Sequence, residues 1–322
     1  MLVPQAEAEG PGPFLDLCLA ARDRYRTLAD EIRDATGEDI EYCNWGLLYL
    51  LDPTEHEAAI GRVAWQRSAG LRVEEVSGRE VRALEPRLHP EIGGALFFPD
   101  EAHVRPCTVV SALAAGARAA GVQILENVEA IDFVLDEDRL RGVNAGGKTF
   151  LADIVVACAG AWSGRLLDLI GHRLPMEPVR GQIIRARFER PPLTHLVWGP
   201  LGYLLPRLNG ELLIGTTVEQ AGFASTPTLA GAAELCEAAK TMAPSLMTAP
   251  FDRAWAGLRP RLPDGLPAIG RFANIPNLYV ATGHYRNGIL LGPLTGELIA
   301  DLIFGKEPPF PLQAFSPDRF AG

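Results

Sequence analysis

Residues Leu278–Leu291 read LYVATGHYRNGILL, and this stretch decides the fold. The mostly apolar run Leu278–Thr282 is typical of a buried β-strand. Gly283 and Gly288 then bracket a short polar segment, and apolar residues at helical spacing follow from about residue 289 to 304. The stretch therefore predicts a strand, a tight turn and a helix in direct succession.

The same succession occurs a second time, around residues 154–170. The run Ile154-Val-Val-Ala-Cys-Ala is apolar throughout and predicts a fully buried strand of the kind found inside parallel sheets. It leads into Gly160-Ala-Trp-Ser-Gly and a second helix. Two such units predict an α/β sheet whose ligand lies at the carboxyl ends of the strands.

Other parts of the chain are consistent with a mixed fold. We expect helices at about 14–36 (ended by Gly37), 106–120 and 228–243. We expect strands at 46–51 and throughout 178–258, and a meander of strands at 128–135, 140–144 and 149–151. Capping boxes are expected at Thr54-x-x-Glu57 and Ser77-x-x-Glu80, and a hairpin turn at Asn209-Gly210.

Composition excludes several classes of function. The formal net charge of the 322 residues is −10, so the chain lacks the net positive charge typical of nucleic-acid-binding proteins. No apolar run reaches the roughly 18 residues of a membrane span, and no signal peptide is visible, so we expect a cytoplasmic protein. The histidines lack metal-ligand spacing, so we expect no metal site. The five scattered cysteines are expected to be reduced and mostly buried.

Three residues could hold a ligand. Arg286 stands at the mouth of a predicted buried strand, beside a helix start whose N–H groups attract electron-rich partners; a solvated surface turn explains it equally. Arg259 lies in the mostly apolar Trp255-Ala-Gly-Leu-Arg-Pro, where a ligand carboxylate, or a distant Glu or carbonyl, could pair with it. Tyr203 shares a strand face with Leu205 and is either a core aromatic or a carboxylate donor. Arg207 is interpreted as a solvated hairpin residue.

No Gly-x-Gly-x-x-Gly opens a helix after a strand anywhere in the sequence, and Gly10-Pro-Gly-Pro is the nearest imitation. The sequence also contains no P-loop, no Gly-x-Ser-x-Gly and no zinc motif.

Three blocks together resemble the D-amino-acid oxidase superfamily: Gly283-His-Tyr-Arg-Asn-Gly-Ile-Leu-Leu, Trp255-Ala-Gly-Leu-Arg-Pro and Ala157-Cys-Ala-Gly-Ala-Trp-Ser. Within it the sequence is most similar to the glycine oxidases of thiamine biosynthesis, over essentially all 322 residues. The resemblance implies an α/β fold in which an incomplete, doubly wound FAD-binding domain (1–36, 100–175 and 258–322) is interleaved with an antiparallel-sheet substrate domain (37–99 and 176–257).

The resemblance also implies roles for single residues. Arg259 matches the arginine that pairs with the substrate carboxylate, Tyr203 the tyrosine that hydrogen-bonds it, and Arg286 an arginine beside substrate and flavin. The positions implied to contact the FAD cofactor are Met1, Leu2, Val128, Gly160, His284, Tyr285, Arg286, Asn287, Gly288, Ile289 and Leu290.

This sequence departs from the family pattern in two ways. The resemblance implies that the first βαβ unit, which would hold the FAD pyrophosphate, and its acidic ribose ligand are absent, so we expect the sequence to start inside the family pattern. A methionine and a histidine that some glycine oxidases carry near the substrate are replaced by Val218 and Leu201.

The implied activity is oxidative deamination of glycine or another small amino acid, with molecular oxygen as the electron acceptor and hydrogen peroxide, ammonia and a 2-oxo acid as products. Two alternatives stay open. One is a related dehydrogenase or oxidase for D-amino acids or N-methyl amino acids such as sarcosine. The other is an inactive, flavin-free fragment with a carboxylate pocket. The resemblance leaves room for a homo-oligomer.

Overall fold

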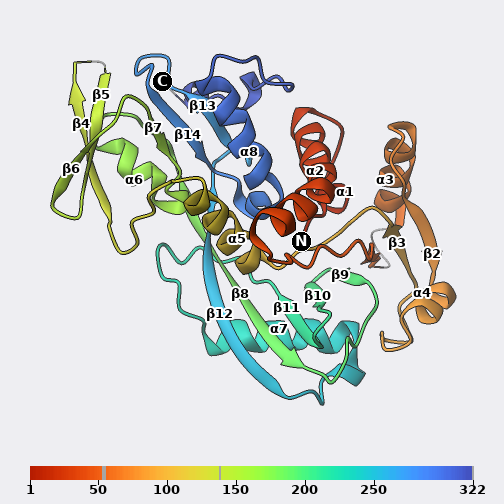
Figure 1. The fold of residues 1–322 in the computed structure, drawn as a ribbon. Helices are drawn as coiled ribbons and strands as arrows, with labels where there is room; N and C mark the ends of the chain where they lie inside the picture. The colour runs from red at the N-terminus through yellow and green to blue at the C-terminus, as the bar shows by residue number, and fades with distance from the viewer. Residues whose placement is uncertain (53–55, 138, 321–322) are drawn as a thin grey trace. The chain divides into compact units, whose positions relative to one another are not determined.

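The structure is a computed structural model that describes residues 1–52, 56–137 and 139–320. The chain folds into two compact units (Figure 1). Unit 1 consists of Met1–Ala29, Asp39–Pro106 and Arg180–Gly257, and unit 2 consists of Asp30–Glu38, Cys107–Val179 and Leu258–Gly322. Which unit binds cofactor and which binds substrate stays a prediction.

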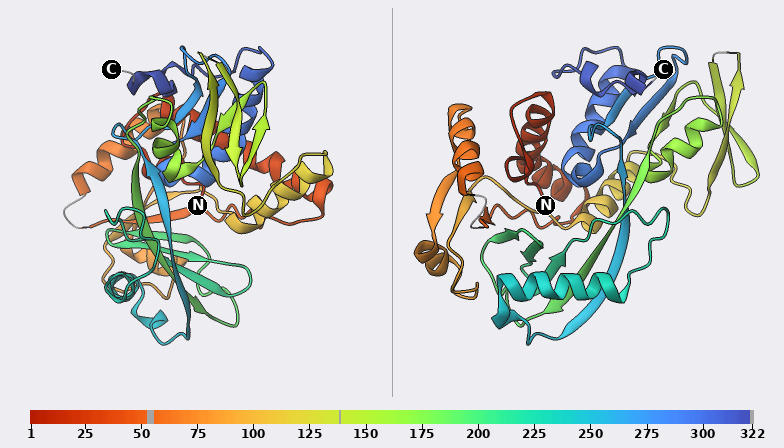
Figure 2. Two further views of the ribbon diagram at one scale, coloured as in Figure 1. Left: turned by 90° about the vertical axis from the view of Figure 1, so that its left-hand side faces the viewer. Right: turned by 180° about the vertical axis from the view of Figure 1, so that it is seen from behind.

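Unit 1 contains most of a large mixed sheet. Its strands, in the order in which they lie side by side, are β12 (Phe251–Arg261), β8 (Glu177–Arg187), β11 (Glu211–Gly215), β10 (Gly202–Pro206), β9 (Leu196–Gly199), β1 (Leu47–Leu50), β3 (Gly94–Phe98) and β2 (Glu74–Ser77). The helix α7 (Leu229–Met242) packs against β10 and β11, as the two views of Figure 2 show, and is followed by the 3-10 turn η2 (Pro244–Leu246).

The hairpin β10–β11 forms as its turn residues predict. Gly210 has φ +80°, which glycine adopts without strain, and Asn209 Oδ1 accepts the Glu211 N–H at 3.2 Å. Side chains then alternate between faces along β10: Tyr203 and Leu205 belong to one apolar cluster, while Leu204 belongs to another. The predicted shared face of Tyr203 and Leu205 is therefore confirmed.

The other helices of unit 1 are α1 (Pro4–Glu7), α2 (Pro13–Thr36), whose residues from Asp30 on belong to unit 2, α3 (His56–Ser68) and α4 (Gly78–Leu84). The capping box predicted at Ser77 is confirmed, because the Ser77 side chain accepts from Glu80 N and the Glu80 carboxylate accepts the Ser77 N–H. The second predicted box, at Thr54, lies outside the described residues. Gly37, with φ +75°, ends α2 as expected.

Unit 2 contains two small sheets and the helices that cover them. The first sheet has the order β13 (Ala268–Arg271), β14 (Leu278–Thr282), β7 (Val155–Ala157), and the second is the meander β4 (Ala130–Asp136), β5 (Arg139–Ala145), β6 (Lys148–Leu151). The helical segments are α5 (Pro106–Ala119), η1 (Gly160–Trp162), α6 (Ser163–Asp168), η3 (Tyr285–Asn287), α8 (Gly288–Ile303), η4 (Gln313–Phe315) and η5 (Pro317–Phe320).

One buried side chain joins the two sheets of unit 2. The Asn277 amide donates to the Leu140 and Asp153 carbonyls, both at 2.8 Å, and its Oδ1 accepts the Leu140 N–H at 3.1 Å. The Asn277 backbone carbonyl also accepts the Val155 N–H at 3.0 Å. These bonds hold the meander against the strands that carry the two glycine turns.

Two sequence-based expectations are wrong. β7 was predicted to lie inside a parallel sheet, but β14 is its one neighbouring strand in the described part of the chain, and Val156 is 37% exposed. The cysteines were predicted to be mostly buried, whereas Cys107 and Cys158 are exposed and Cys18 and Cys43 are buried. Both errors concern contacts with distant segments, which local composition does not encode.

None of the described helices is both long enough and apolar enough to cross a membrane.

Asn277→Ala should lower the free energy of unfolding by about 2–4 kcal/mol, because it leaves the buried Leu140 N–H and two carbonyls without partners. Urea unfolding followed by circular dichroism measures the change. The matched control is Asn274→Ala, which removes an exposed contact with His172 and should cost less than about 1 kcal/mol. Equal effects of the two changes would contradict the role given to Asn277.

Candidate functional site

The two glycine turns of unit 2 lie side by side at the carboxyl ends of β7 and β14. These strands pair in parallel, with Val280 opposite Ala157. The Thr282 hydroxyl donates to the Gly160 carbonyl at 3.1 Å and accepts from the Ser163 hydroxyl at 2.9 Å. The structure therefore brings the predicted Gly160 and the 283–290 segment together.

The backbone of the second turn requires glycine at its first position. Gly283 has φ +75°, and a Cβ there would stand 2.5 Å from Leu262 Cδ1. The chain then forms η3, in which the Asn287 N–H donates to the His284 carbonyl at 2.8 Å, and α8 begins at Gly288. Gly288 is exposed, and a Cβ there would meet only His284 Cβ, at 3.9 Å. The start of α8 is therefore open to a ligand.

His284 lies beneath the turn. Its Nε2 is 3.0 Å from the Thr295 hydroxyl on α8. Burial lowers the pKa of the imidazole to about 4, so the ring is neutral at physiological pH. His284 therefore anchors the turn to α8 as a neutral hydrogen-bonding group.

The two candidate arginines of unit 2 belong to β12 and to η3. Arg259 and Arg286 are half-buried. Arg261, two residues beyond Arg259, lies 3.8 Å from the Glu177 carboxylate and 5.8 Å from the centre of the Tyr285 ring. Sequence reasoning did not single out Arg261, although its position at i+2 from Arg259 on a strand predicts the same face.

Tyr203 is held in unit 1 by aromatic and glycine contacts. The residue is 8% exposed, and its ring meets the Trp198 ring edge-on, with centroids 6.4 Å apart. Gly215 faces it across the hairpin, where a Cβ would stand 2.5 Å from the Tyr203 hydroxyl. The close approach fixes the ring and accounts for glycine at position 215.

Three predicted cofactor positions lie apart from the turns in the sequence. Leu2 is fully buried in unit 1 and exchanges backbone hydrogen bonds with Ala102, at 2.8 and 3.1 Å. Met1 is half-buried in the same unit. Val128 is 36% exposed in unit 2, next to Gly146. Their roles toward a cofactor stay predictions.

Arg207 is buried, and its interpretation as a solvated hairpin residue is wrong. The side chain is 2% exposed and donates to the Val104 carbonyl at 2.6 Å and to His103 Nδ1 at 2.9 Å. Since Arg207 always donates, His103 Nδ1 must accept, and the proton resides on Nε2. Burial and the Arg207 charge lower the pKa of His103 to about 2. A neutral tautomer of His103 is thereby fixed.

Glu101 is a second buried polar group of this segment. One carboxyl oxygen accepts the Gln5 N–H at 2.7 Å, whereas Oε2 has no partner within the described part of the chain. Burial raises the pKa of Glu101 to about 8, against the opposing effect of Arg22. Glu101 is therefore largely protonated at neutral pH.

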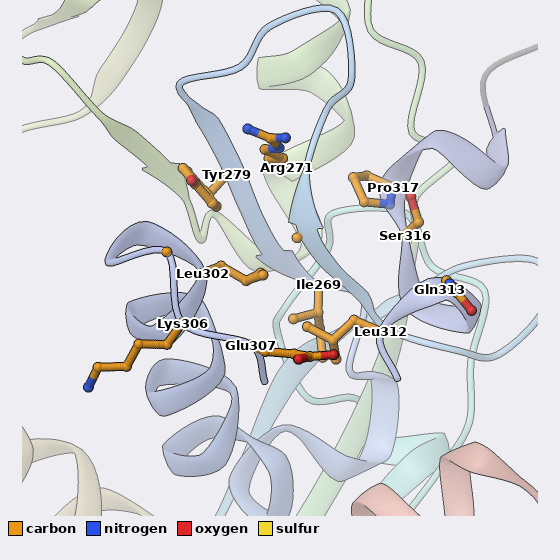
Figure 3. Close-up of a pocket in the computed structure, with 12 residues that line it drawn as sticks. Ile269, Arg271, Tyr279, Leu302, Lys306, Glu307, Leu312, Gln313, Ser316 and Pro317 are labelled. Atoms are coloured by element: carbon orange, nitrogen blue, oxygen red, sulfur yellow. The ribbon is translucent and has the colours of Figure 1, made fainter. Parts of the chain in front are cut away.

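A cavity of about 560 Å³ opens on unit 2 between β13, β14, the end of α8 and the segment 312–317 (Figure 3). Tyr279 and Arg271 line it from the strands and Leu302 lines it from α8. Arg271 pairs with Tyr279, near the amino end of β14, whereas the glycine turn follows its carboxyl end. None of the predicted site residues lines this cavity.

Residues 1–302 match the family described as DAO, FAD dependent oxidoreductase. The chain belongs to this family. Among curated members, it is 35% identical to a glycine oxidase of Bacillus licheniformis over 309 residues, which is 95% of this chain and 82% of that protein. It is also 35% identical to a glycine oxidase of Geobacillus kaustophilus over 325 residues, covering all of this chain and 86% of that protein.

Two solved structures have the same fold. The crystal structure of the Geobacillus kaustophilus glycine oxidase superposes with a TM-score of 0.96, covering 100% of this chain and 87% of the other. An iminodiacetate oxidase from a Chelativorans species superposes at 0.88, with 26% identity, 98% of this chain and 86% of the other. The predicted fold class is confirmed.

The described residues fit one end of the family's cofactor. Gly160, at φ +54°, and Gly288 both leave open space where a side chain would stand, and the N–H groups at the start of α8 can face the electron-rich edge of a flavin ring. The phosphates of a dinucleotide, in contrast, are held by a glycine-rich turn after a first strand. The sequence contains no such turn, so the residues present do not fit the pyrophosphate end.

Glu101→Gln should become progressively more stable than the parent protein as pH rises. In the folded state the Glu101 pKa is about 8, above its ordinary value of 4.5, so its stabilising contribution is complete below about pH 4.5 and is lost as pH rises through 8. The difference in unfolding free energy should grow by at most about 1.4 kcal/mol per pH unit between pH 5 and 8. Urea titrations at four pH values measure it, with Glu38→Gln, an exposed change, as control. A pH-independent difference would show that Glu101 ionises normally in the fold.

Proposed function

We propose that this chain, with FAD bound, oxidises glycine or another small amino acid to a 2-oxo acid. The main support is structural: Thr282 hydrogen-bonds residues of both glycine turns, and Arg286 lies in the second turn. The chain also belongs to the FAD-dependent oxidoreductase family. Glycine oxidases 35% identical over almost the whole chain support the substrate class.

The substrate carboxylate is bound, in this proposal, by Arg259 with help from Tyr203. A guanidinium presents two parallel N–H donors that match a carboxylate, and a tyrosine hydroxyl adds a third donor. The Tyr203 ring packs between Trp198 and Gly215, and these contacts hold its hydroxyl in place before substrate binds. Arg286 adds positive charge on the turn that precedes α8.

The chemistry of the reaction comes from the cofactor. FAD, when bound, would supply a two-electron acceptor for the hydride lost from the substrate's Cα–H, while the amine loses one N–H proton, so that molecular oxygen would receive two electrons and two protons as hydrogen peroxide. The resulting imine is hydrolysed to the 2-oxo acid and ammonia. The protein orients the Cα–H bond by fixing the carboxylate and keeps His284 neutral beneath the turn.

We also propose a cytoplasmic protein with a small amino acid and molecular oxygen as its reactants and no nucleic-acid partner. The net charge of −10 supports the last point.

A second candidate function is oxidation of D-amino acids or N-methyl amino acids such as sarcosine, with oxygen or another acceptor. Val218 and Leu201, which replace a methionine and a histidine of some glycine oxidases, favour it, and both are more than half exposed in unit 1. The similarity to an iminodiacetate oxidase is in line with a larger amine substrate.

The rates of oxidation of different substrates distinguish the two candidate functions. Because the phosphate contacts are absent from this sequence, the assay uses a fused protein in which the residues that precede the matched region of the Geobacillus kaustophilus glycine oxidase stand ahead of Met1. Oxygen consumption is measured with glycine, sarcosine and D-alanine, and reduction of an artificial dye is measured in parallel. A flavin-loaded protein inactive on all three substrates would overturn the proposed function.

In this fused protein, Arg259→Ala should lower kcat/KM for the amino acid by roughly 30- to 900-fold, equivalent to about 2–4 kcal/mol, mainly through KM. Arg259→Lys should recover only part, because an ammonium cannot reproduce the two-donor contact. The control is Arg253→Ala, an exposed arginine on the same strand β12 that lies over the Trp255 ring. Unchanged kinetics in Arg259→Ala would place the carboxylate site elsewhere.

Gly288→Val and Gly283→Ala should separate cofactor binding from folding. Gly288→Val adds bulk into open space at the start of α8, so it should leave the unfolding midpoint nearly unchanged and weaken FAD binding at least about tenfold. Gly283→Ala forces a side chain into Leu262 at positive φ and should destabilise the fold by more than about 1 kcal/mol. Flavin fluorescence and thermal unfolding measure the two quantities. If the Gly288→Val variant binds FAD with normal affinity, the flavin ring does not bind at this turn.

A further inference from the structure

The cavity on unit 2 has the dimensions of a small-molecule site. Its volume of about 560 Å³ falls within the roughly 300–1,000 Å³ of pockets that bind ligands in other proteins. The strands β13 and β14, the end of α8 and the segment 312–317 line it. It lies near the amino end of β14, whereas the glycine turn follows the carboxyl end of that strand, so the cavity is separate from the proposed substrate site.

One end of the cavity carries hydrogen-bond donors that have no protein acceptor. Tyr279 and Arg271 stand opposite each other in the antiparallel register of β14 and β13, so their side chains share a face. Tyr279 is 6% exposed, yet its hydroxyl makes no hydrogen bond with another described residue. A buried tyrosine hydroxyl ordinarily has a partner. Arg271 is exposed, and no described acidic residue pairs with it. Both groups are therefore available to an acceptor in the cavity.

The middle of the cavity is apolar. Figure 3 shows Leu302, Ile269 and Leu312 between the end that carries Arg271 and Tyr279 and the opposite end. Ile269 precedes Arg271 by two residues on the same face of β13, so the two side chains leave the strand roughly 7 Å apart. Apolar walls favour the burial of hydrocarbon groups and disfavour an unpaired charge. A ligand that crosses this part of the cavity must therefore be apolar in its middle.

The opposite end of the cavity is acidic. The Glu307 side chain lies there, beside Ile269 and Leu312, and no described basic residue forms an ion pair with it (Figure 3). The neighbouring Lys306 points away from the cavity, and its ammonium group lies 3.7 Å from the Asp301 carboxylate. An unpaired carboxylate attracts a cation. The cavity therefore has a donor-rich, positively charged end and a negatively charged end, with apolar walls between them.

This arrangement matches a ligand with a carboxylate and an ammonium group at opposite ends of an apolar body. A guanidinium binds a carboxylate through two parallel N–H donors, and a tyrosine hydroxyl can add a third. A free amino acid carries both charges on one carbon atom, so it cannot reach both ends. An extended peptide gains about 3.3–3.6 Å per residue, so two or three residues span a separation of roughly 7–10 Å.

We propose that this cavity is a second binding site, for short peptides with apolar side chains and free termini. The peptide carboxylate accepts hydrogen bonds from Arg271 and Tyr279. Its apolar side chains pack on Ile269 and Leu302, and its ammonium group faces Glu307. The site takes no part in the proposed oxidation, so it stands or falls independently of that function.

The test measures peptide binding to the 322-residue chain by isothermal titration calorimetry. The probe is the tripeptide leucyl-alanyl-leucine, which should bind one-to-one with a dissociation constant below about 1 mM. The C-terminal amide and the N-acetylated form of this tripeptide each lack one terminal charge, so each should bind at least about tenfold more weakly. Free leucine should also bind at least about tenfold more weakly, because it cannot span the two ends.

Variants assign each end of the peptide to its partner. In Arg271→Gln the tripeptide should bind as weakly as its amide, and in Glu307→Gln it should bind as weakly as its acetylated form, because each variant removes the charge that distinguishes the two. Tyr279→Phe removes only a hydroxyl and should weaken binding at least about threefold. The matched controls are Arg173→Gln and Glu129→Gln, at exposed positions of unit 2 outside the cavity, and they should bind as the parent does. Thermal unfolding checks that every variant is folded.

Several outcomes would overturn the inference. These are no saturable binding of the tripeptide, equal binding of the tripeptide and its two capped forms to the parent, free leucine binding as tightly as the tripeptide, or unchanged binding in Arg271→Gln and Glu307→Gln. Arg259→Ala distinguishes this cavity from the proposed substrate site, because it should leave tripeptide binding unchanged. Loss of tripeptide binding in Arg259→Ala but not in Arg271→Gln would place the peptide in the substrate site and refute the second site.

Discussion

The hydroxyl of Thr282 is the contact on which the candidate site depends. It accepts from Ser163 and donates to the Gly160 carbonyl, so it links two turns that are more than a hundred residues apart in sequence. The link can form because β7 and β14 are parallel neighbours, which puts both of their carboxyl ends at one edge. The turn that leads into α8 is thereby fixed to Gly160.

Two ionisable side chains of unit 1, Arg207 and Glu101, are buried with neutral hydrogen-bond partners. Arg207 donates to a carbonyl and to a neutral histidine, and Glu101 lies in the same buried segment with a raised pKa. A buried guanidinium needs hydrogen-bond acceptors to offset its lost hydration. The Val104 carbonyl and His103 supply them, and in doing so they fix one tautomer of the imidazole. The segment that carries Ala102 is thus held by polar contacts as well as by its backbone bridge to Leu2.

Much of the fold follows from local patterns. The strand, turn and helix of 278–303, the long helix ending at Gly37, the meander and the hairpin at Asn209-Gly210 all stand where the sequence predicts them. Each of these elements is specified within a few residues, by periodicity, glycine conformation or a capping side chain. The candidate turn was found for the same reason, since Gly283 and Gly288 mark it locally.

The sequence by itself determined the elements, the family and the residues of the glycine turn. The tertiary structure alone decided which of these became neighbours. The burial of Arg207, the edge position of β7 and the link through Thr282 all depend on segments distant in sequence, and the energy of a polar or apolar side chain is set by what surrounds it. Val155–Ala157 has the same composition inside a sheet or at its edge, so only the presence or absence of a neighbouring strand distinguishes the two.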